Sequence, residues 1–183
     1  MHRRKFIGIT GAGIIGISIL AKCRNSTIIS QWRFFTDEEV LILEAACEQI
    51  IPADKDPGAK EANVVNFIDK QMVNYYKSHQ NAYRVGIAGI QETSKILYKQ
   101  SFDKLSFDQQ YQIMLLLEAG EAKGKIWEEN SSSAFFDLLR EHTMQGFYGS
   151  PKHGGNKNYV SYKMIGIDVP QIIGQNRYHT KNL

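Results

Sequence analysis

The first clear pattern in the chain is a helix-start signal followed by a long apolar run. Thr36 precedes Glu39 by three residues, the spacing of a capping box, in which each side chain accepts a hydrogen bond from the other residue's backbone N–H. Apolar residues are then nearly continuous up to Ile51, and Pro52 follows. Because proline interrupts a helix, the pattern predicts a helix that begins after Thr36 and ends before Pro52, buried on most sides.

Three further stretches repeat apolar residues at the spacing of a helix with one buried face. The repeating residues are Val65, Ile68, Met72 and Tyr75, then Tyr83, Ile87, Ile90 and Leu97, and finally Phe135, Leu138, Leu139 and His142. The last of these helices is expected to start from the serines at 131–133 and to stop at Gly146.

Another predicted helix lies between residues 106 and 124. Ser106 and Gln109 have capping-box spacing before the apolar run 111–117, and Gly120 or Gly124 is expected to end the helix. No stretch shows the sustained alternation with β-branched residues that is typical of strands. The sequence therefore predicts an all-α fold, a single compact domain of about five main helices.

The character of the chain changes after Gly146, where a glycine-rich, aromatic segment without periodicity begins. It lacks the glycine spacing of a phosphate-binding loop and has no preceding strand. Two alternatives stay open for it: packing against its own helices, or contact with another protein, with Tyr148 as an exposed anchor and a left-handed backbone at Gly155. The interface candidates are Phe147, Tyr148, Pro151, Gly154, Gly155 and Asn156.

Residues 1–25 have the layout of an export signal, with a basic start, an apolar glycine-rich stretch and a polar end. The pair Arg3 and Arg4, followed by Phe6 and Ile7, resembles the twin-arginine motif, whose pathway carries folded cargo. The general secretory route and an uncleaved anchor are the alternatives. Lys22 stands where a lipobox needs a small residue, so a lipidated Cys23 is disfavoured. We expect a periplasmic protein with no stable membrane span once the signal is removed.

Charge and length set the remaining organisation. Residues 26–35 are expected to be a linker, and residues 36–183 one helical domain. The formal charge is +3, but the leader holds five basic residues and no acid, which leaves −2 for the rest of the chain. A basic surface for nucleic acid is therefore not expected.

Candidate chemistry is sparse in this sequence. The five histidines never have metal-ligand spacing. Residues 52–59 have a proline where a calcium loop needs its third ligand, and no Glu closes a twelve-residue loop. Cys47 and His142 lie in apolar helical patterns, so we expect a buried thiol and a buried or interface imidazole. Glu118, Glu121, Glu128 and Glu129 read as solvated carboxylates. The sequence predicts no catalytic, cofactor or metal site in this chain.

The closing segment also carries a family resemblance. Residues 146–156 and the later Lys163-Met164-Ile165-Gly166 resemble the closing motif of the gluconate 2-dehydrogenase subunit 3 family. The resemblance extends to Phe35-Thr36 with Glu39, to Ile50-Ile51-Pro52, to residues 59–69 ending in Phe67-Ile68-Asp69, and to the leader. His153 and Tyr162 depart from it, where an aromatic residue and a Trp are expected.

The resemblance implies a non-catalytic small subunit. Its partner would be a large flavoprotein dehydrogenase of the glucose-methanol-choline type that oxidises a sugar or sugar acid with FAD, with haem c in a third, cytochrome subunit as acceptor. The small subunit would help that partner to fold and would supply its twin-arginine export signal. The alternative function is a periplasmic binding or adhesion module unrelated to redox chemistry.

Overall fold

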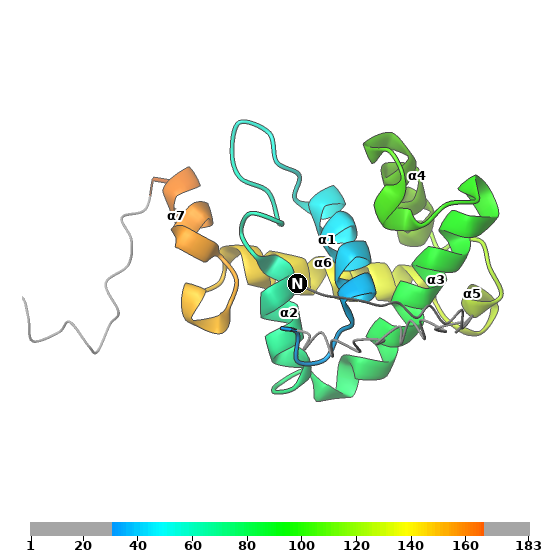
Figure 1. The fold of residues 1–183 in the computed structure, drawn as a ribbon, viewed down its shortest axis with the longest axis horizontal. Helices are drawn as coiled ribbons and strands as arrows, with labels where there is room; N and C mark the ends of the chain where they lie inside the picture. Colours follow the sequence, from blue (N-terminus) through cyan, green and yellow to red (C-terminus); the bar gives the residue numbers. More distant parts are fainter. Residues whose placement is uncertain (1–30, 167–183) are drawn as a thin grey trace, which may run out of the picture.

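The computed structural model describes residues 31–166, and this part of the chain is all-α, as predicted (Figure 1). Seven α-helices and four short 3₁₀ helices occur, and no strand is found among residues 31–166. Five of the α-helices have nine residues or more. The α-helices are α1 Asp37–Ile50, α2 Val64–Met72, α3 Gln80–Tyr98, α4 Phe107–Glu118, α5 Ile126–Glu129, α6 Ser132–Tyr148 and α7 Val160–Met164, and the 3₁₀ helices are η1 Lys77–His79, η2 Phe102–Lys104, η3 Pro151–His153 and η4 Lys157–Tyr159.

The helix starts follow the predicted capping signals. Both capping boxes are formed: the Thr36 N–H donates to the Glu39 carboxylate at 2.8 Å, and the Ser106 N–H donates to the Gln109 side chain at 3.1 Å. The Ser131 hydroxyl accepts the N–H of Ala134 at 3.1 Å and caps α6. These side chains satisfy backbone donors that the first helical turn leaves unpaired.

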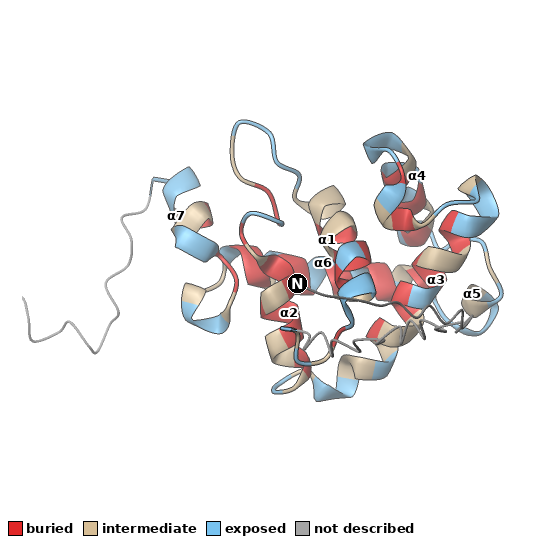
Figure 2. Ribbon diagram, in the orientation of Figure 1, coloured by how far each residue is buried: buried red, intermediate tan, exposed pale blue. Residues whose placement is uncertain are grey.

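The helix α6 is the structural centre. It packs against α1, α2, α3, α4 and α7, and lies behind α1 and α2 in Figure 1. Buried residues concentrate on α1, α2 and α6, where these helices face one another (Figure 2). The predicted buried Cys47 lies in this core, where the Thr143 hydroxyl donates to its sulfur at 3.3 Å. Burial raises the pKa of the Cys47 thiol to about 12, so this thiol stays protonated.

Three details of the sequence prediction are wrong. The α2 helix ends at Met72, so the helical spacing does not extend to Tyr75, which is exposed. Near the end of α3 the last buried residues are Thr93 and Ser94, and Leu97 in the final turn is 40% exposed. Gly146 does not stop α6, which runs on to Tyr148.

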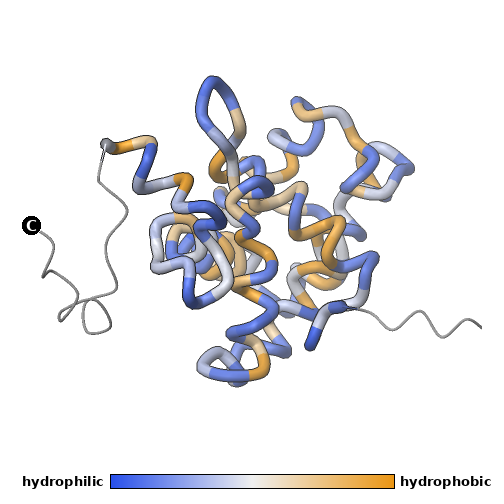
Figure 3. The backbone as a smooth tube through the Cα atoms, turned by 60° about the vertical axis from the view of Figure 1, so that its left-hand side comes forward, coloured by the Kyte–Doolittle hydropathy of each residue, from blue (hydrophilic) through white to orange (hydrophobic). Residues whose placement is uncertain are grey.

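Gly146 serves packing instead of helix termination. A Cβ at this position would lie 3.0 Å from Cδ1 of Phe67, so the missing side chain lets α2 approach α6 closely. Most helices contain both hydrophilic and hydrophobic residues, as expected for helices that are buried on one side (Figure 3). Among residues 31–166, no helix combines the length and apolarity needed to cross a membrane.

Candidate partner interface

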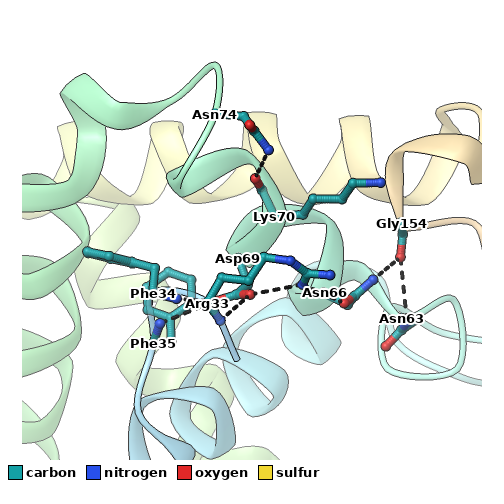
Figure 4. Close-up of polar contacts among 9 residues, drawn as sticks. All are labelled: Arg33, Phe34, Phe35, Asn63, Asn66, Asp69, Lys70, Asn74 and Gly154. Carbon is teal, nitrogen blue, oxygen red and sulfur yellow. Dashed lines mark hydrogen bonds and ion pairs between the residues drawn. The ribbon is translucent and has the colours of Figure 1, made fainter. Parts of the chain in front are cut away.

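One short helix, α2, holds the entry segment, residues 33–35, which comes shortly before α1. The Asp69 carboxylate is completely buried and accepts the backbone N–H groups of Arg33 at 2.9 Å, Phe34 at 2.9 Å and Phe35 at 3.1 Å (Figure 4). The Arg33 guanidinium adds an ion pair at 3.3 Å. A buried carboxylate needs such donors to offset its lost hydration. The last three residues of the predicted linker are therefore part of the packed domain.

The side chain of Arg84 on α3 fastens the same segment from the other side. It donates to the Phe34 carbonyl at 2.7 Å, pairs with the Glu39 carboxylate, and lies over the Phe34 ring at 4.3 Å from the ring centroid. Phe35 packs into the core beside Tyr83. The chain therefore enters the domain along a fixed path between α2 and α3.

Asn66 and Lys70 of α2, with Asn63 at its N-cap, hold the glycine-rich closing loop, residues 149–159. The Asn66 amide donates to the Gly154 carbonyl at 2.7 Å, and the Asn63 amide approaches the same oxygen at 3.5 Å (Figure 4). The Lys70 ammonium donates to the Lys152 carbonyl at 3.1 Å. One helix thus braces both the entry segment and the closing loop.

Two glycines make this close approach feasible, for different reasons. Gly154 has a left-handed φ of +106°, which glycine adopts without a Cβ penalty. The expected left-handed backbone at Gly155 is wrong. Gly155 is needed for space, because a Cβ there would lie 2.1 Å from the Gly146 carbonyl oxygen.

Asn156 completes the bracing from inside the protein. Its amide donates to the Gly149 carbonyl at 2.9 Å, and its side-chain oxygen accepts the Ser161 N–H at 3.0 Å. The side chain is buried and its backbone is left-handed, with φ +42°. Asparagine tolerates this conformation better than most residues. Asn156 therefore links the end of α6 to α7.

The six predicted interface residues separate into two groups. Phe147, Gly155 and Asn156 are buried, so in this structure they brace the loop and offer no surface to a partner. Tyr148 is 45% exposed, and Pro151 and Gly154 are half-buried. The interface prediction now rests on Tyr148 and on the outer surface of the loop.

An open groove of about 350 Å³ lies beside Tyr148, between α2, α6 and the closing loop. Phe67, Tyr76 and Met144 give it apolar walls, and Gln71, Gln145 and His153 supply polar groups. The Tyr76 hydroxyl donates to the Gln145 side chain and joins the residue before η1 to α6. The groove therefore lies between elements that are already tied together.

The comparisons with known proteins give one match. The family model for gluconate 2-dehydrogenase subunit 3 matches residues 37–168, most of the chain. The chain belongs to the gluconate 2-dehydrogenase subunit 3 family. No curated protein and no solved structure matches the chain.

Behind the groove, this member of the gluconate 2-dehydrogenase subunit 3 family has a buried aromatic stack. The ring of His142 lies parallel to Tyr76, with centroids 4.0 Å apart, and its Nδ1 is hydrogen-bonded to the Tyr83 hydroxyl at 2.9 Å. Burial, helped by the nearby His79, lowers the pKa of His142 to about 4. His142 is therefore a satisfied, neutral core histidine, one of the two alternatives that its sequence pattern left open.

Two sequence predictions bear on the site from elsewhere in the chain. Arg3, Arg4, Phe6 and Ile7 of the export signal lie outside the described residues. Within residues 31–166, no group of three His, Cys, Asp or Glu side chains is placed to hold a metal ion.

Sequence reasoning missed Asn63, Asn66 and Lys70, and gave Asp69 no role. The sequence offers one indication of the role of Asp69: an acidic residue beside Ile68 in a helix that is expected to be mostly buried.

Proposed function

We propose that this chain is the non-catalytic small subunit of a periplasmic, FAD-dependent dehydrogenase that oxidises a sugar or sugar acid. The large subunit would carry the FAD and the chemistry, and a cytochrome with haem c would take the electrons. The observation that carries this proposal is the family match over residues 37–168. The groove and the braced closing loop support it, since a small subunit needs a preformed surface for its partner.

The small subunit is further proposed to assist folding of the large subunit and to supply its export signal. The paired Arg3 and Arg4, with Phe6 and Ile7 after them, support the twin-arginine route. A route for folded cargo suits this role because the two subunits would assemble before they cross the membrane. The entry segment, residues 33–35, is packed into the domain and would then fix where the leader leaves it.

The test is fractionation of cells that produce both subunits, with Arg3 and Arg4 both changed to Lys. Lysine keeps the charge but loses the planar guanidinium, so both subunits are expected to stay in the cytoplasm together. Lys5→Arg is the matched control and should leave export unchanged. If the large subunit still reaches the periplasm in the double variant, the small subunit does not carry it.

A further inference from the structure

The groove beside Tyr148 has mainly apolar walls. Its lining contains no Asp, Glu, Lys or Arg side chain. Tyr148 and Met144 stand at its edge with 45% and 44% of their surfaces exposed, and Tyr75, next to Tyr76, is 84% exposed. Large apolar side chains gathered around a concave, well-braced site are typical of a protein-binding surface.

Charge is distributed unevenly around the groove. Residues 142–166, which include the closing loop and α7, contain three lysines and no acidic residue, whereas residues 31–141 contain 18 acidic and 12 basic residues. The closing loop and α7 lie at the opposite end of the molecule from α4 and α5 (Figure 1). Glu141 is the acidic residue one turn before the groove, and its carboxylate accepts a hydrogen bond from Gln145.

We propose that this groove is the docking site for the large subunit, and that it receives an uncharged apolar side chain from a segment flanked by acidic residues. The apolar walls select the inserted side chain. Lys152, Lys157 and Lys163 provide the complementary charge along the closing loop and α7. This inference rests on the proposed function and specifies the chemistry of the partner surface.

Charge disfavours one of the two other possible occupants, and the shape of the groove disfavours the other. A second copy of this chain, placed symmetrically, would set one lysine-rich loop against another, and like charges in contact oppose association. An anionic lipid surface would attract the lysines, but Phe67 in the groove wall is buried, so a concave site favours an inserted protein side chain over a flat bilayer surface.

The test measures binding of the mature chain to the purified large subunit, by immobilising one and following the other at 50 and 300 mM salt. Tyr148→Ala is expected to weaken binding by tenfold or more, mainly through faster dissociation. Lys152→Glu with Lys157→Glu is expected to slow association by about tenfold at low salt and to reduce the salt dependence. The matched control, Lys123→Glu with Lys125→Glu before α5, should bind like the wild type.

The outcomes separate the two proposals. If the wild-type chain does not bind the large subunit at all, the proposed function fails. If the wild type binds and the Tyr148 and closing-loop variants bind equally well, the groove assignment alone is overturned. Met144→Glu is a second groove variant, at an exposed position. The melting temperature of each variant is compared with that of the wild type, so that a loss of binding is separated from a loss of folding. Binding of the chain to phosphatidylglycerol vesicles that depends on Lys152 and Lys157, with unchanged binding to the large subunit, would assign the loop to lipid instead.

Discussion

The side-chain amide of Asn66 donates a 2.7 Å hydrogen bond to the backbone carbonyl of Gly154, 88 residues later in the chain. Asn66→Ala removes this bond and leaves the carbonyl only the longer contact from Asn63. We expect a loss of about 1 kcal/mol in the free energy of unfolding. Amide hydrogen exchange in residues 150–157 should become faster, which mass spectrometry of peptide fragments can measure.

The control for this variant is Asn74→Ala. The Asn74 amide donates to the Lys70 carbonyl at 2.7 Å but does not touch the closing loop (Figure 4). Exchange in residues 150–157 should therefore match the wild type. Equal exchange in all three proteins would mean that Asn66 does not hold the loop.

Asp69→Asn tests the bracing of the entry segment. An amide keeps one acceptor oxygen for the Phe34 and Phe35 N–H groups but sets an NH₂ donor against the Arg33 N–H, so the variant should lose about 2–3 kcal/mol of stability. Trypsin should also cleave after Arg33 faster than in the wild type. Asp137→Asn, which changes an exposed acid paired with Arg140, should shift stability by no more than about 0.5 kcal/mol. Comparable losses in the two variants would contradict the assigned role of Asp69.

His142 predicts a specific pH dependence of stability. Its pKa is about 4 in the folded protein and about 6.5 when unfolded, so the unfolded chain takes up a proton first as the pH falls. This contribution to stability is constant above about pH 6.5 and is lost as the pH falls toward 4. From pH 7.5 to pH 5 the loss should be about 2 kcal/mol, measured by urea unfolding.

The comparison protein for this effect is His142→Gln, which cannot take up the proton and keeps a hydrogen-bonding group near the Tyr83 hydroxyl. The stability difference between wild type and variant should shrink as the pH falls from 6.5 to 5. A difference that stays constant over this range would show that His142 is protonated alike in both states.

The parts of the fold that the sequence predicts are those set by neighbouring residues. The capping boxes at Thr36 and Ser106 depend on a partner three residues away, so their spacing is visible in the sequence. The burial of Cys47 and His142 follows from their places in apolar helical stripes. The same periodicity failed at Tyr75 because it does not indicate where α2 ends.

The parts that the sequence does not predict depend on contacts between distant residues. Asp69 meets the entry segment across 34 to 36 residues. The residues next to Gly155 in the sequence do not show that a Cβ at this position would clash with the Gly146 carbonyl. The burial of Phe147 has the same origin, because only the packed structure distinguishes it from its exposed neighbour Tyr148.

The two attachments of α2 become available at different times during synthesis. Residues 33–35 leave the ribosome before α2, whereas Gly154 emerges only after α3 to α6 have been made. Since chains begin to fold from the N-terminus, the entry segment is fixed early and the closing loop last. A chain released before residue 150 lacks the wall of the groove that His153 and the loop provide. If the groove is the docking site, it would be complete only after residue 153 has been made, and a chain that stops earlier would lack part of it.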